Sequence, residues 1–359
     1  MPNDFDLAAL ALKSECPSND ILYDDKNMPS FMVFVPKLTY AQLGLGSSTA
    51  TFPAFIVNGS EVEGIWISKY QNIVNDGRAY SLPCVTQTSN VTFDQARQYC
   101  EAKGAGWHLM TALEWGALIL WCESNGAIPK GNTAWGKDHS ETNYKAIPAD
   151  YESGNIRRVK TGTGPLTWFH DQTPSGIADL AGNVWEWTGG MRLVKGELQV
   201  MTNNNAADSD HSQGASSAEW KAIDATTGEL ITPNGSGTTT NSIKADWVSS
   251  KITWSATITD SAPGSHYCMF QDITCAASIA DAAKTVLRAL GMLPKASTII
   301  TGNQRCYVNN AEDERCLRRG GNYGSGYAGG FASWSLSDPR TSQYVSIGFR
   351  AAYVKLPAA

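Results

Sequence analysis

The sequence predicts a mixed α+β fold, with two helices in its N-terminal half followed by short antiparallel strands and long loops. Three observations support this prediction. Two segments combine helix start signals with apolar faces, alternating apolar residues mark several strands, and glycine and asparagine mark the turns between them. The chain has 359 residues, of which 42% are hydrophobic and 17% charged, so a buried core in one large domain is expected.

Each predicted helix begins with a capping box. Thr92 lies three residues before Gln95, and Thr111 lies three residues before Glu114. At this spacing the threonine side-chain oxygen accepts a hydrogen bond from the backbone N–H three residues later. The Gln or Glu side chain in turn accepts from the backbone N–H of the threonine. A glycine is expected at or just beyond each helix end: Gly104 and Gly126.

The predicted strands share β-branched or aromatic composition and adjacent turn residues. Pro36 is expected to mark the edge or end of its strand, because proline cannot donate a ladder hydrogen bond. The predicted strands and turns are residues 31–40, residues 63–72, residues 184–188 after a turn at Gly182–Asn183, a strand from Met191, and residues 197–201 after a turn at Lys195–Gly196.

The chain divides into regions of different composition. Residues 1–60 are expected to form an N-terminal extension and residues 61–354 the main domain. A polar insertion of about residues 202–300, partly ordered, contains a predicted helix over residues 277–293. Because the extension and the insertion lie outside the predicted core of the domain, either one is expected to mediate oligomerisation or attachment to a larger particle.

Charge and hydropathy exclude several classes of protein. The formal net charge is −6, and no basic run exceeds two residues, so nucleic acid is not an expected partner. No apolar stretch reaches the length of a membrane span, and the N-terminus has no readable secretory signal. The eight cysteines are expected to be mainly free thiols, with local bridges Cys84–Cys100 or Cys268–Cys275 left open.

One segment near the C-terminus has an unusual composition. "LRRGGNYGSGYAGGFASWSLSDPRTSQYVSIGFRAA" is rich in Ser, Gly and Tyr and resembles an antibody binding surface, in which rigid aromatic side chains supply contact area and small polar ones adapt. Phe331, Leu336 and Ile347 are predicted to be internal. The predicted exposed ligand contacts are Tyr323, Ser325, Tyr327, Ser333, Trp334, Ser335, Ser337, Asp338, Gln343, Tyr344 and Ser346.

The motifs "GWHLMTALEW", "ADLAGNVWEWTGG", "LRRGGNYG" and "GFRAA" occur in that order. They resemble C-type-lectin-fold proteins of the formylglycine-generating-enzyme type, over about residues 63–200 and 300–354. That superfamily includes variable proteins of diversity-generating retroelements, among them phage tail receptor-binding proteins, and residues 318–352 resemble their variable region. The resemblance implies a hypervariable protein on a phage particle or bacterial surface, which binds an unknown protein or glycan on a cell surface.

Two other functions of that superfamily or fold are alternatives. The oxidases resembled here keep a cysteine pair after the Arg-Gly-Gly motif, yet no cysteine follows Cys316. A related nonheme-iron oxidoreductase would need histidine ligands, and the five histidines lack ligand spacing, so no catalytic residue is assigned. A calcium-dependent carbohydrate-binding lectin would carry Glu-Pro-Asn or a similar motif, and Asp338–Pro339 is a poor substitute.

No cofactor is expected, with one possible exception, a structural calcium ion. The resemblance places this ion near "GNVWEW", with Asn183 and Glu186 as ligands. The competing interpretation is that Asn183 serves the turn and Glu186 is a carboxylate that lies at the surface or is bonded in the core. Trp185 and Trp187 lie two residues apart and are assigned to the scaffold.

Overall fold

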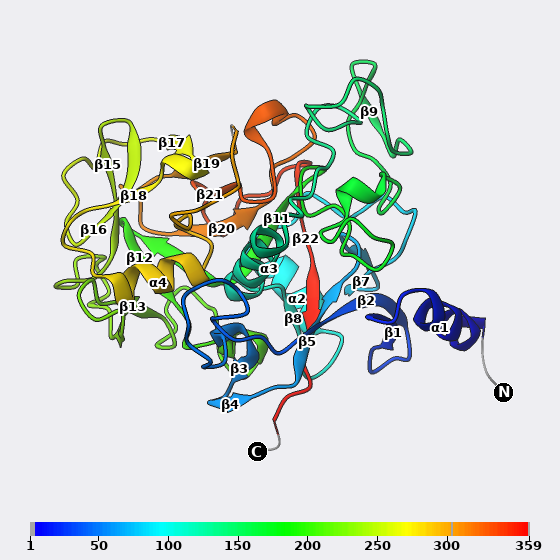
Figure 1. Cartoon of the computed structure of the whole chain (residues 1–359), viewed down its shortest axis with the longest axis horizontal. Coiled ribbons are helices and arrows are strands. Elements are labelled where there is room, and N and C mark those ends of the chain that lie inside the picture. The colour runs from blue at the N-terminus through cyan, green and yellow to red at the C-terminus, as the bar shows by residue number, and fades with distance from the viewer. Residues whose placement is uncertain (1–3, 303, 358–359) are drawn as a thin grey trace.

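The C-terminal strand of the chain lies between two strands from its N-terminal third. The computed structural model, which describes residues 4–302 and 304–357, places them in one antiparallel five-stranded sheet of order β1-β2-β5-β23-β8 (Figure 1). Ala352 lies opposite Ile67 on one side and His108 on the other. The strands are β1 (Asn19–Tyr23), β2 (Pro29–Pro36), β5 (Gly64–Ser68), β23 (Ala351–Tyr353) and β8 (Trp107–Leu109).

A second sheet of twelve strands carries the C-terminal segment and the insertion. Its main order is β17-β19-β21-β20-β11-β12-β15-β16-β18, with β13 and β22 attached to β12 and β11, and β14 attached to β13. The bounds are β11 (Trp185–Val194), β12 (Glu197–Val200), β13 (Lys221–Ile223), β14 (Leu230–Ile231), β15 (Lys244–Val248), β16 (Lys251–Ser255), β17 (His266–Met269), β18 (Thr274–Cys275), β19 (Arg305–Val308), β20 (Arg315–Arg319), β21 (Trp334–Leu336) and β22 (Ile347–Phe349).

Three short hairpins and four helices complete the described fold, and helix α3 packs on α4 and β11. The hairpins are β3 (Ile56–Val57) with β4 (Ser60–Glu61), β6 (Ile73–Asn75) with β7 (Arg78–Tyr80), and β9 (Tyr151–Glu152) with β10 (Asn155–Ile156). The helices are α1 (Asp4–Glu15), α2 (Phe93–Glu101), α3 (Ala112–Asn125) and α4 (Asp281–Ala289). The predicted mixed α+β class is confirmed.

The predicted helix starts are confirmed. Both capping boxes form, at Thr92 with Gln95 and at Thr111 with Glu114. Gly126 caps α3 in the left-handed conformation, as expected, whereas α2 ends earlier, with Ala102 rather than Gly104 as its cap. Helix α4 is likewise shorter than the predicted residues 277–293.

The two strands predicted at residues 184–188 and from Met191 are one strand. Strand β11 runs from Trp185 to Val194, and its pairing register with β20 shifts between Trp187 and Arg192. Gly190 lies within the shift at a φ of 76°, which favours glycine. Gly189 and Gly190 therefore form an irregularity within β11 rather than a turn that ends it.

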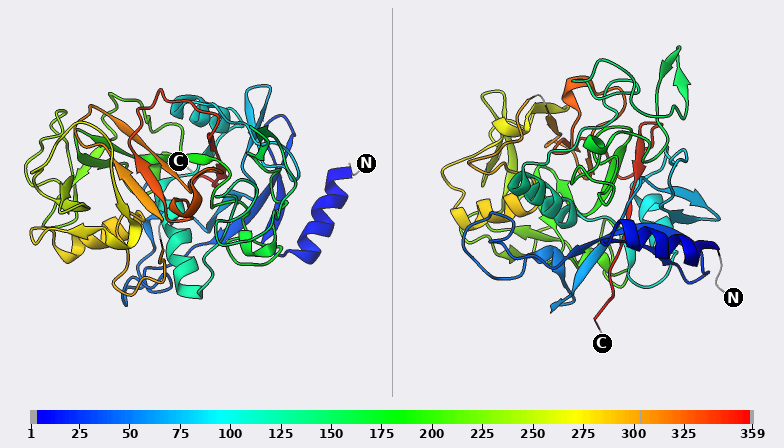
Figure 2. Two further views of the ribbon diagram at one scale, coloured as in Figure 1. Left: turned by 90° about the horizontal axis from the view of Figure 1, so that it is seen from above. Right: turned by 45° about the vertical axis from the view of Figure 1, so that its right-hand side comes forward.

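The N-terminal extension and the insertion are both built into the fold. Residues 32–36 of strand β2 in the extension pair with the whole of β5, and strands β13 to β18 of the insertion extend the larger sheet. The insertion is thus more ordered than predicted. Helix α1 alone lies at the margin of the molecule (Figure 2). Within the described residues, no helix is long and apolar enough to span a membrane.

A buried ion pair joins the two sheets. Arg350, just before β23, donates to both carboxylate oxygens of Glu186 in β11, each at 3.0 Å. The same guanidinium donates to the carbonyls of Ser68 and Ala178, and Gln71 donates to Glu186 at 2.9 Å. Arg350 is 0% exposed and Glu186 is 1% exposed, so each charge depends on the other for compensation.

Glu186→Gln should therefore destabilise the protein strongly. The substitution leaves the Arg350 charge buried without a counter-ion, which costs about 3–5 kcal/mol of unfolding free energy. Urea denaturation measures this loss. The control is Glu61→Gln, which breaks the exposed Lys37–Glu61 pair and should have little effect. Equal effects of the two substitutions would contradict the assigned role of Glu186.

Candidate functional site

One face of the larger sheet carries a row of polar and aromatic side chains. Tyr267 in β17 lies opposite Tyr307 in β19, which lies opposite Ser335 in β21, Arg318 in β20 and then Trp187 in β11. Residues opposite one another point to the same face of a sheet. Helix α2 covers the Trp187 end through Phe93, at 6.1 Å between ring centroids. Much of the rest of the row remains near the surface.

We define the tyrosine–arginine surface as Tyr267, Arg305, Tyr307, Arg318, Tyr327 and Tyr344. Arg305 lies over the ring of Tyr267 at 4.4 Å and that of Tyr327 at 5.4 Å. Tyr267 also packs on Tyr307, with 5.7 Å between ring centroids. Tyr327 and Tyr344 are each 52% exposed and Tyr267 is 46% exposed. The surface thus combines accessible tyrosine rings with a guanidinium between two of them.

Arg318 occupies the other half of this surface. Its guanidinium lies 5.3 Å from the ring of Trp185 and pairs with the carboxylate of Asp338. Trp185 in turn packs edge-on against Tyr307. Burial lowers the pKa of Arg318, opposed by Asp338 and the nearby Tyr344. The guanidinium nevertheless stays charged at neutral pH, because its ordinary pKa is above 12.

Three polar atoms beneath the surface have no protein partner within the described residues. They are Nε of Arg305, Nε of Arg318 and the hydroxyl of Ser335, which is only 1% exposed. Buried polar groups are usually hydrogen-bonded, so such atoms call for water or a ligand. Their positions in neighbouring strands place an unsatisfied polar strip under the tyrosine rings.

The opposite face of these strands is packed into the core. Trp334 packs on Trp254 at 6.3 Å, and Phe331 packs on Trp115 at 5.9 Å. The predicted internal positions Phe331, Leu336 and Ile347 are each 0% exposed, which confirms that prediction. The surface therefore rests on a rigid, tightly packed support.

Four of the predicted ligand contacts are wrong because they are buried. Strand β21 is an internal strand between β19 and β20, so Trp334 points into the core and Ser335 lies beneath neighbouring side chains. Ser333 donates to the carbonyl of Ala328 within the protein. Tyr323 packs edge-on against Trp135 at 5.2 Å and is only 7% exposed.

The other seven predicted contacts are exposed or half-buried: Ser325, Tyr327, Ser337, Asp338, Gln343, Tyr344 and Ser346. Four of them bond other side chains: Ser325 bonds Asn322, Tyr327 bonds Arg305, Ser337 bonds Ser265 at 2.6 Å and Asp338 bonds Arg318. Sequence reasoning missed Tyr267, Arg305 and Tyr307. The alternation in "RCYV", with Arg305 and Tyr307 outward and Cys306 inward, was the available signal.

Asn183 and Glu186 do not fit the predicted calcium site. Glu186 already accepts from Arg350 and Gln71, and an arginine beside the carboxylate would repel a cation. The Asn183 oxygen accepts from Asn132 and from the backbone of Val159. Within the described chain, no group of three or more His, Cys, Asp or Glu side chains is placed to hold a metal ion. Both residues serve the scaffold.

Two cysteines just before the Arg-Gly-Gly motif and one buried histidine are also neutral or engaged. All eight cysteines are free, and burial raises the pKa of both Cys306 and Cys316, so these thiols stay protonated at neutral pH. His108 is 1% exposed and bonds Glu114 at 2.8 Å and the carbonyl of Gly106. It is therefore a satisfied core histidine.

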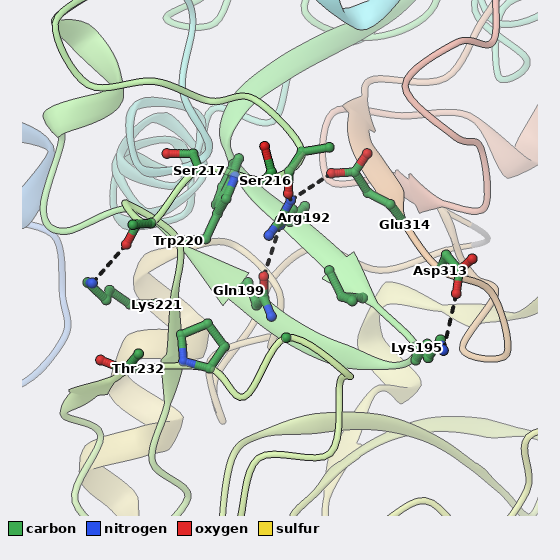
Figure 3. A pocket seen from close by; sticks show the side chains of 15 residues that line it. Arg192, Lys195, Gln199, Ser216, Ser217, Trp220, Lys221, Thr232, Asp313 and Glu314 are labelled. Carbon is green, nitrogen blue, oxygen red and sulfur yellow. Dashed lines mark hydrogen bonds and ion pairs between the residues drawn. The ribbon is translucent and has the colours of Figure 1, made fainter.

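A cavity of about 630 Å³ lies elsewhere, between β11, β12 and the insertion (Figure 3). Most of its charged groups satisfy one another: Arg192 bonds Glu314 and Gln199, and Lys195 pairs with Asp313. Lys221 bonds only the carbonyl of Ala218. The tyrosine–arginine surface is the better candidate site, because several of its hydrogen-bond donors have no partner within the described residues.

Residues 48–222 match the family model described as the Sulfatase-modifying factor enzyme 1-like domain. The mixed α+β class of the predicted fold is seen in the structure, and this match is in keeping with the predicted relation to the formylglycine-generating enzymes. No curated protein matches the chain.

Three solved structures resemble the chain weakly. PvdO from Pseudomonas aeruginosa is 11% identical at a TM-score of 0.36, over 93% of this chain and 98% of that one. The Major Tropism Determinant P3c variant is 11% identical at a TM-score of 0.32, over 94% of this chain and 71% of that one. Treponema denticola variable protein 1 is 12% identical at a TM-score of 0.31, over 94% of this chain and 100% of that one.

Calcium should not stabilise this protein through Asn183 and Glu186. Because Arg350 and Gln71 occupy the Glu186 oxygens, adding calcium chloride or a chelator should leave Tm unchanged. Differential scanning calorimetry checks this, with magnesium chloride as the ionic-strength control. A rise in Tm specific to calcium, lost in Asn183→Ala, would restore the calcium site.

Proposed function

We propose that this protein is a ligand-binding variable protein of a diversity-generating retroelement. Its tyrosine–arginine surface recognises a protein or glycan on a cell surface, from a phage particle or a bacterial surface. The observation that carries the proposal is the surface itself, where exposed tyrosines and unsatisfied arginine donors lie over a packed support. Tyrosine and arginine dominate binding energy at recognition surfaces.

The proposed mechanism is display without a chemical step. Residues 318–352 supply Tyr327, Gln343 and Tyr344, whose exposed side chains can change without disturbing the core. The alternative is an oxidase or iron enzyme of the same superfamily, in keeping with the matched domain. The neutral buried thiols favour the binding function, and copper or iron bound stoichiometrically to the purified protein would favour the enzyme.

Two experiments test the proposal. Sequencing the DNA around the gene should find a near-repeat of the segment that encodes residues 318–352, differing only opposite adenines; its absence would contradict the retroelement assignment. A display library randomised at Tyr327, Gln343 and Tyr344 should yield folded binders to an unrelated probe such as lysozyme. A library without folded binders would contradict the display mechanism.

The triple variant Tyr327→Ala, Gln343→Ala, Tyr344→Ala should keep the Tm of the parent protein, because these side chains are exposed. The matched control is Trp334→Ala, in the same segment but 0% exposed, which should lose about 3–5 kcal/mol of unfolding free energy. Thermal and chemical denaturation measure both. Strong destabilisation by the triple variant would show that these positions serve the fold.

A further inference from the structure

We propose that the tyrosine–arginine surface binds an acidic segment of a protein partner, with one carboxylate held at Arg305. This inference rests on the proposed binding function and adds the chemical class of the ligand.

Arg305 is a cation without a compensating anion. Within the described residues it has no carboxylate within ion-pair distance, whereas its neighbour Arg318 pairs with Asp338, and Arg340 pairs with Glu314 and Asp94. Arg305 is thus an uncompensated cation on a surface whose other arginine, Arg318, is paired. Charge complementarity therefore favours an anionic ligand at this position.

The surroundings of Arg305 prepare it to bind a carboxylate. Tyr267 and Tyr327 lie against the guanidinium, and the Tyr327 hydroxyl accepts from it at 3.2 Å. Such ring contacts restrict the side chain and leave donors along the edge of the guanidinium plane. Two parallel hydrogen bonds from an arginine edge match the two oxygens of a carboxylate.

The unsatisfied atoms point to the same chemistry. The Nε atoms of Arg305 and Arg318 can only donate, and the buried Ser335 hydroxyl can also donate. Because these three atoms are themselves buried, water is their expected partner, whereas a ligand on the surface must accept hydrogen bonds from the half-buried Arg305 side chain. Carboxylates and backbone carbonyls of an acidic peptide segment supply acceptors at several points.

A protein segment fits this surface better than a glycan. Sugar hydroxyls need acceptors as well as donors, and the carboxylate of Asp338 is already bonded to Arg318. The exposed rings of Tyr267, Tyr327 and Tyr344 instead offer separate apolar contacts between polar groups. That combination of aromatic anchors and arginine is typical of protein interfaces.

The test uses the full chain and fluorescein-labelled poly-L-glutamate as the probe, with binding measured by fluorescence anisotropy at low ionic strength. The parent protein should bind, and Arg305→Gln should weaken binding about tenfold, because one charged contact is lost. Arg305→Lys keeps the charge without the planar fork and should fall between the two. The matched control Lys37→Gln removes an exposed cation beside the five-stranded sheet and should bind like the parent.

Several outcomes would overturn the inference. The inference is wrong if the parent protein does not bind poly-L-glutamate, or if Arg305→Gln binds it as well as the parent does. Hyaluronan that binds as tightly as poly-L-glutamate would indicate a glycan ligand instead. Tm measurements verify that each variant folds, and Arg305→Lys gives a second result should Arg305→Gln unfold. If the protein does not bind poly-L-glutamate but the display library yields binders to lysozyme, only the acidic ligand is wrong. If neither result is obtained, the proposed function is contradicted as well.

Discussion

The fold depends on the buried pair between Glu186 and Arg350. Arg350 bonds the end of β5 through Ser68 and the segment before β11 through Ala178, so one guanidinium holds together parts of the chain that are distant in sequence. The local dielectric is low, which makes the pair strong when intact and costly when broken. The positions of β11 and β22, and thus the edge of the tyrosine–arginine surface, follow from this contact.

Local signals in the sequence were sufficient for the helices but not for the sheets. The capping boxes of α2 and α3 involve residues three apart, so their chemistry is visible in a short window. The glycines in β11 resemble a turn locally, and only the pairing with β20 keeps the strand continuous. The residues around Glu186 were equally compatible with a calcium ligand and with an internal ion pair, because the partner Arg350 lies 164 residues away in the sequence.

The candidate site was only partly predictable, because it too depends on strand pairing between distant parts of the sequence. Composition correctly marked Tyr327 and Tyr344 as exposed, yet it could not separate Trp334 from them, because burial of β21 depends on its flanking strands β19 and β20. Tyr267 and Arg305 belong to the surface only because β17 and β19 pair beside β21. Such non-local pairing leaves no trace in a sequence window.

The central position of β23 has a consequence for protein synthesis. This strand lies between β5 and β8, and Arg350 immediately precedes it, so the five-stranded sheet cannot close until the end of the chain has left the ribosome. A premature stop codon anywhere in residues 318–347 removes β22, β23 and Arg350 together. Truncated products of a mutated gene would then fail to fold, and only full-length chains would present a binding surface.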